Sequence, residues 1–132
     1  MKRLAIALSG AVAMTATAYG SSPIKVKTDN GVVIAGSNSY KTLYTFAEDK
    51  EGVSNCYDIC AHKWPPHLAE YWDDPRPPFS IFERRNGKKQ WALDGMPLYF
   101  SILDRKKGET NGDGVDGVWK AARPEDDTSG AQ

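Results

Sequence analysis

Three strand-like runs decide the fold, within residues 79–100, which read FSIFERRNGKKQWALDGMPLYF. Asn86-Gly87 and Asp94-Gly95 separate these runs. Both pairs favour tight turns, because Asn, Asp and Gly tolerate positive φ angles. Apolar runs bounded by such turn signals predict strands that follow one another as a β-meander. The second half of the chain is therefore expected to form an antiparallel sheet.

The first half carries an earlier copy of this pattern. Each copy has an Asn-Gly turn, a Leu-Tyr strand and a final aspartate. These features fall at Asn30-Gly31, Leu43-Tyr44 and Asp49, and again at Asn86-Gly87, Leu98-Tyr99 and Asp104. One hairpin alone cannot bury its apolar face, so two copies are expected to pack as pseudo-symmetric halves. We predict a small, single-domain all-β protein of two hairpin-based repeats, forming a β-meander or sandwich-like sheet.

A long irregular connection separates the two copies. Residues 51–78 hold both cysteines, both histidines and most of the prolines. Proline cannot continue a helix or sit in a central strand, so only one helical turn is expected, near residues 57–63. Long loops in compact domains are more often functional than short ones.

The two ends of the chain predict export and a tail. A basic start, an apolar run and small residues follow one another over residues 1–18, which is the order of a secretory signal peptide. The apolar run is shorter than the roughly 20 residues that span a bilayer. We therefore expect a signal peptide at residues 1–18, a domain over 19–124 and a disordered acidic tail over 125–132. The mature protein is then periplasmic or secreted, with no membrane span.

Charge and motifs narrow the function. The chain has 17 basic and 17 acidic residues, which gives no electrostatic case for binding nucleic acid. Arg84-Arg85 and Lys88-Lys89 flank a turn, and we expect a solvated hairpin tip there. The sequence has no nucleophile-elbow serine, no H-E-x-x-H and no Gly-rich loop that opens a helix. These features favour a non-enzymatic protein without deciding the matter.

Cys56 and Cys60 are the only cysteines. Exported proteins enter an oxidising compartment, and residues four apart on a helical turn lie within reach of a disulfide. We expect a structural disulfide that closes a small loop. The alternative is a copper or thiol-redox site, in which both thiolates and His62, with His67 nearby, would suit a soft ion such as Cu(I).

A second set of candidate ligands follows the meander. These oxygen-bearing side chains are Glu109, Asn111, Asp113 and Asp116. Their alternation around a glycine resembles the first half of a Ca²⁺ loop. Lys120 stands where such a loop needs its bidentate glutamate, so we favour a Gly-Asp turn cluster. No cofactor is expected, and copper and calcium remain the alternatives.

An ordered set of short motifs resembles a known family. Its main residues here are Tyr44, Phe46, Asp49, Trp64, Pro65, Tyr99, Asp104 and Trp119. Together with Gly112-Asp113-Gly114, this order resembles the bacterial secreted-repeat family, predicted lipoproteins with a Yx(FWY)xxD motif. The resemblance implies an exported protein and carries no established activity. It covers almost all of the expected mature chain.

Three features depart from the family pattern. The leader has no lipobox cysteine, so this member is expected to be soluble where many relatives look anchored. Ser101 stands where the second motif copy requires an aromatic residue, and Phe100 carries the ring on the opposite strand face. Lys120 follows the last Gly-Val-Trp, where relatives often carry histidine.

The aromatic residues Tyr44, Phe46, Trp64, Trp91, Tyr99 and Trp119 are mostly expected to form the core. Trp72 lies in a polar, proline-rich setting and is the aromatic residue most expected to be exposed. An exposed Trp72 would suit a sugar or a partner, but we favour a loop that packs over the sheet. We therefore predict an exported, non-enzymatic binding or interaction module for an unknown envelope protein or small ligand, of unknown oligomeric state. The alternative is the copper or thiol-redox accessory protein. A hydrolase would require Asp49 and Asp104 in one cleft.

Overall fold

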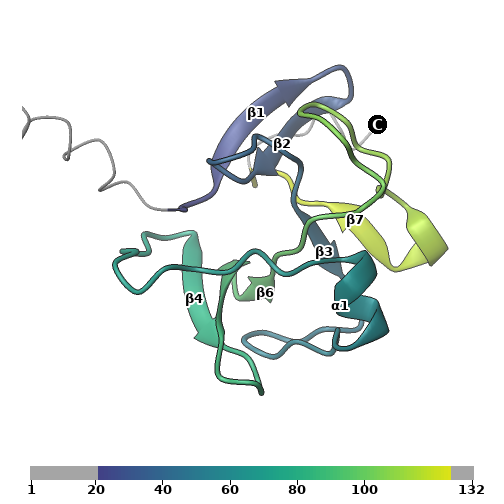
Figure 1. The fold of residues 1–132 in the computed structure, drawn as a ribbon. Coiled ribbons are helices and arrows are strands. Elements are labelled where there is room, and N and C mark those ends of the chain that lie inside the picture. Colours follow the sequence, from purple (N-terminus) through teal and green to yellow (C-terminus); the bar gives the residue numbers. More distant parts are fainter. Residues whose placement is uncertain (1–20, 126–132) are drawn as a thin grey trace, which may run out of the picture.

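The structure is a computed structural model that describes residues 21–125 (Figure 1). The regular secondary structure of the described residues is mainly strands in small antiparallel sheets, with one short α-helix and one short 3₁₀ helix. In chain order, the elements are β1 (Ile24–Thr28), β2 (Gly31–Ala35), β3 (Tyr44–Phe46), α1 (Ile59–Lys63), β4 (Phe79–Glu83), β5 (Lys89–Leu93), β6 (Met96–Pro97), η2 (Val115–Gly117) and β7 (Trp119–Ala121). The all-β prediction is confirmed. The predicted leader and all but the first residue of the predicted tail lie outside the described residues.

Three small antiparallel sheets organise the described residues. β1 pairs with β2 across a tight turn at Gly31, whose φ is 97°. β4, β5 and β6 form the predicted meander, with Ile81 opposite Trp91. β3 pairs with β7, so a strand of the first copy lies beside the last strand of the chain (Figure 1). This last pairing ties the two copies together.

The two copies meet at Tyr44 and Tyr99. The Tyr44 amide donates to the Tyr99 carbonyl at 2.7 Å, and the Tyr99 amide donates to the Tyr44 carbonyl at 2.9 Å. Bonds further out repeat this reciprocal relation. They run from Ala47 N to Val118 O and from Ile102 N to Lys63 O. The halves are therefore related by an approximate two-fold exchange, as the internal repeat predicts.

Two hydrophobic clusters lie on opposite faces of the strands. Consecutive residues alternate between them, because successive side chains of a strand point to opposite faces. The first cluster holds Val33, Tyr44, Phe46, Cys56, Trp64, Tyr99, Trp119 and Ala121. The second holds Ile34, Leu43, Trp91, Leu93, Leu98 and Ala122, with Phe100 packed against it. The predicted placement of Phe100 on the face opposite the motif aromatic is confirmed.

The connection between the copies contains the expected helical turn. α1 ends at Lys63, and the next residue, Trp64, caps it with an amide that donates to the Cys60 carbonyl at 2.8 Å. Pro65 and Pro66 follow directly and cannot extend the helix. The end of the helical turn therefore fixes the position at which Trp64 enters the first cluster.

Candidate functional site

Each motif tyrosine bonds the aspartate of the other copy. Tyr44 Oη donates to Asp104 Oδ2 at 2.6 Å, and Tyr99 Oη donates to Asp49 Oδ2 at 2.7 Å. All four residues are buried. Burial, reinforced by hydrogen bonding to the acids, raises the pKa of both tyrosine hydroxyls well above their usual range. The hydroxyls therefore stay protonated and act as donors.

The second oxygen of each acid holds the loop that follows it. Asp49 Oδ1 accepts from the Asn55 amide at 2.7 Å, and Asp104 Oδ1 accepts from the Asn111 amide at 2.9 Å. The side chains of Asn55 and Asn111 return to the backbone carbonyls just before the acids, at Glu48 and Leu103. Burial raises the pKa of Asp49. Each carboxylate therefore joins a tyrosine of the other copy to the loop that follows it.

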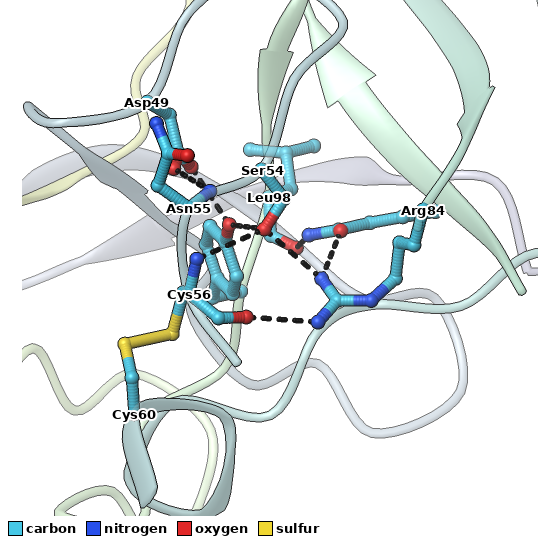
Figure 2. The surroundings of a disulfide bond; sticks show 9 residues. Asp49, Ser54, Asn55, Cys56, Cys60, Arg84 and Leu98 are labelled. Carbon is cyan, nitrogen blue, oxygen red and sulfur yellow. Dashed lines mark hydrogen bonds between the residues drawn. A yellow bond between two sulfur atoms is a disulfide. The ribbon is translucent and has the colours of Figure 1, made fainter. Parts of the chain in front are cut away.

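A disulfide joins Cys56 and Cys60, as predicted (Figure 2). Cys56 is fully buried in the first cluster, and its amide donates to Ser54 Oγ at 3.2 Å. Ser54 Oγ in turn lies 2.6 Å from Tyr99 Oη. Ser54 thus connects the disulfide-bonded loop to the Tyr99–Asp49 pair.

Arg84 completes this network from the side of the meander (Figure 2). Its guanidinium donates to Gln90 Oε1 at 2.6 Å and to the Cys56 carbonyl at 2.8 Å. It also lies over the Tyr57 ring, 4.3 Å from the centroid. Only 3% of Arg84 is exposed, so the prediction of a solvated hairpin tip is wrong for this residue. Gln90 of β5 and the Cys56 carbonyl of the cysteine loop supply acceptors that allow the charge to be buried, whereas the neighbouring Arg85 is exposed.

The predicted copper ligands do not come together. His67 is buried, and its Nε2 donates to the Ser21 carbonyl at 2.8 Å, while its ring meets Phe100 edge-on. Burial lowers the pKa of His67. His62 is exposed on α1. Within residues 21–125, no group of three or more His, Cys, Asp or Glu side chains is placed to hold a metal ion.

The predicted calcium ligands mostly turn toward the backbone of their own loop. Glu109 Oε1 accepts from the Arg105 amide at 2.6 Å. Asp113 accepts from the Ala121 amide at 2.9 Å and lies 3.6 Å from Arg123. Asp116 is exposed, away from these bonds. These bonds favour the Gly-Asp turn cluster over a calcium loop, and they hold the segment that precedes β7 in the sequence.

The motif aromatics form one continuous stack. The Phe46 ring lies 4.3 Å from Trp119, and Trp119 lies 3.9 Å from Trp64, with nearly parallel planes. Tyr44 and Tyr99 meet the two indoles edge-on. Such offset and edge contacts stabilise beyond the area that they bury. The motif residues thus supply both the buried tyrosine–aspartate hydrogen bonds and the centre of the first cluster. Pro65, the residue after Trp64, accepts a hydrogen bond from the Phe100 amide through its carbonyl.

Two aromatic side chains point to solvent in the loop before β4. Tyr71 is 93% exposed and Trp72 is 48% exposed. Their rings meet edge to face at 4.8 Å. Asp73 beside them accepts from the amide and hydroxyl of Ser21, at 2.9 and 2.6 Å, and from the Glu70 amide. These bonds fix the loop against the start of the domain.

Comparison with known families matches both halves. The family model described as a secreted repeat of unknown function matches residues 25–67 and 80–123. The chain belongs to this secreted-repeat family. Its two matches coincide with the two structural halves and cover more than half of the chain, and the protein is exported, secreted or periplasmic. No curated protein and no solved structure matches it significantly. No helix among residues 21–125 is long and apolar enough to cross a membrane.

Proposed function

We propose that this secreted-repeat protein is a non-enzymatic binding module that recognises an envelope protein through the exposed ring pair of Tyr71 and Trp72. The observation that carries the proposal is the exposure of two adjacent large aromatic side chains, 93% and 48%. Tyrosine and tryptophan are the residues that most often dominate the binding energy of protein interfaces. Such side chains cost free energy when left in water, which favours a role at a contact.

The rigid setting of the ring pair supports this role. Asp73 is the residue directly after Trp72, and it is hydrogen-bonded to both Ser21 and Glu70. A loop that is already ordered loses less conformational entropy when it binds. The ring pair is therefore presented in a preorganised form.

The engagement of the motif acids supports a scaffold role over hydrolysis. Asp49 and Asp104 each use one oxygen for a tyrosine and the other for a backbone amide. A general base must lie within hydrogen-bond reach of the proton that it takes, and both acids are buried, at 6% and 4% exposure. These acids instead stabilise the fold that carries the exposed loop.

Site-specific photo-crosslinking in the producing cell tests the proposal. A photoreactive phenylalanine replaces Tyr71 in one strain and Tyr40, which is 48% exposed, in a matched control strain. We expect a discrete protein adduct from position 71 that is lost on adding Trp72→Ala, and no such adduct from position 40. Trp72→Ala alone should leave the melting temperature unchanged, since surface substitutions shift stability by no more than about 0.5 kcal/mol. Equal adducts from both positions, or none from 71, would overturn the proposal.

A further inference from the structure

The aromatic stack of the first cluster is complete on one side only. Along the stack, Phe46 lies on Trp119, and Trp119 lies on Trp64. The two-fold exchange of the copies relates Trp119 to Trp64. It also relates Phe46 to Ser101, because each stands two residues after the motif tyrosine. Ser101 carries no ring, so the second copy lacks the fourth member that symmetry would place beside Trp64.

A cavity that is half open to solvent lies beside this position, where Trp64 and Ser101 are 6% and 4% exposed. Its volume is about 280 Å³, and Trp64, Ser101 and Val115 are among its lining residues. Ile102 and Leu103 also line it and are 55% and 50% exposed. In the first copy the corresponding residues are Ala47 and Glu48, which provide no such aliphatic rim. The apolar character is thus specific to the side of the stack that lacks a ring.

We infer that this cavity binds a small planar aromatic molecule of one or two fused rings, seated beside Trp64 as Phe46 sits beside Trp119. The geometry of the first copy provides the pattern, since Phe46 stacks at 4.3 Å with an interplanar angle of 10°. Aromatic pairs in such offset stacks gain energy beyond simple area burial. Ligand pockets of roughly 300–1,000 Å³ hold drug-sized molecules, so a smaller cavity favours a smaller ligand.

The rim selects among aromatic molecules. Lys63 and Asp116 both line the cavity and carry opposite charges. Opposite charges at one rim give no net attraction for a strongly charged ring, and they favour a neutral ligand such as an indole or a phenol. This site is distinct from the Tyr71 and Trp72 loop. That loop leads into β4 on the left of Figure 1, whereas α1, whose last residue Lys63 lines the cavity, lies on the right.

Titration of the full mature protein with indole, followed by heteronuclear NMR, tests the inference. We expect saturable shifts that concentrate at the Trp64 side chain and the Val115 methyl groups. Cyclohexanol, an aliphatic ring of comparable size, should bind about two- to tenfold more weakly, because it lacks the stacking contribution. Ser101→Phe should fill the cavity with the missing ring and weaken indole binding by at least about tenfold.

The matched control is Ser80→Phe, the same substitution at an exposed position of β4, which should bind indole as the wild type does. Absence of shifts at Trp64 and Val115 in the wild type would overturn the inference without any variant having to fold. Equal binding of indole and cyclohexanol, or equal binding by the two phenylalanine variants, would also overturn it. None of these results bears on crosslinking at position 71, so the two proposals fail separately.

Discussion

Removing the Tyr44 hydroxyl should destabilise the protein through an acid in the other copy. In Tyr44→Phe, Asp104 loses a donor at 2.6 Å, and the Gly112 amide loses an acceptor at 3.1 Å. A hydrogen bond to a charged group contributes about 1.5–3 kcal/mol and a neutral one about 1 kcal/mol, so the expected loss is about 2–4 kcal/mol. For a domain of this size that lowers the melting temperature by about 10–20 °C. Tyr71→Phe, at an exposed tyrosine, should change stability by less than about 0.5 kcal/mol.

Double-mutant cycles test whether the Tyr44 hydroxyl bonds the aspartate of the other copy or the aspartate of its own copy. The hydroxyl of Tyr44 reaches Asp104, although its own motif copy ends at Asp49. Tyr44→Phe combined with Asp104→Ala should therefore show a coupling energy of about 1.5–3 kcal/mol, since both changes remove one interaction. Tyr44→Phe combined with Asp49→Ala should be additive to within about 0.5 kcal/mol.

Urea unfolding of the oxidised mature protein, monitored by tryptophan fluorescence, supplies these energies. A change in stability shifts the urea midpoint and leaves the dependence of the unfolding free energy on urea concentration unchanged. A change in that dependence signals a changed unfolded or native state. A coupling to Asp49 as large as that to Asp104 would refute the exchange of partners. So would a Tyr44→Phe variant as stable as Tyr71→Phe.

Other perturbations test the remaining parts of the structure by the same unfolding assay. Replacing Cys56 and Cys60 together by alanine should cost about 2 kcal/mol, the entropy of closing a short loop in the unfolded chain, and an unchanged midpoint would contradict this. Burial lowers the pKa of His67 below its ordinary 6.5, so the unfolded chain gains a proton first as the pH falls. The free energy of unfolding should then decrease as the pH falls from 7 to 5.5, by up to about 1.4 kcal/mol per pH unit. His67→Gln should flatten this decrease, whereas the control His62→Gln should leave it unchanged. Gly112→Ala would place its Cβ 2.8 Å from a buried indole ring and should cost about 1–3 kcal/mol, whereas wild-type stability would show that the ring moves aside.

Local signals in the sequence were sufficient to predict the strands. Asn86-Gly87 and Asp94-Gly95 favour tight turns by their own backbone preferences, and β4, β5 and β6 follow them in order. The helical turn before Trp64 was equally predictable, because proline after it removes the alternative of a longer helix. The cysteine pair required only its spacing and the oxidising compartment.

The contacts of the candidate site depend on residues far apart in the chain. Tyr44 and Asp104 are 60 residues apart, and Tyr99 and Asp49 are 50 apart, so the repeat reveals the acids but not which tyrosine each one meets. Arg84 illustrates the same limit. Beside a turn it resembles a solvated cation, and only the folded cysteine loop, 28 residues away, provides the carbonyl that allows its burial.

The exchange of partners predicts that the two copies fold as one unit. A single copy would bury the Tyr44 hydroxyl and the Asp49 carboxylate without their partners, at about 1–3 kcal/mol for each unsatisfied group. The tyrosine and the aspartate of the motif must therefore be present in both copies for either copy to be satisfied. The motif position between the tyrosine and the aspartate makes no hydrogen bond to its counterpart in the other copy, so the two copies can carry different residues there. It does differ, with Phe46 in one copy and Ser101 in the other, and the cavity lies where the ring is missing. Specific binding is therefore expected at this break in the symmetry, because the symmetric positions are already committed to the fold.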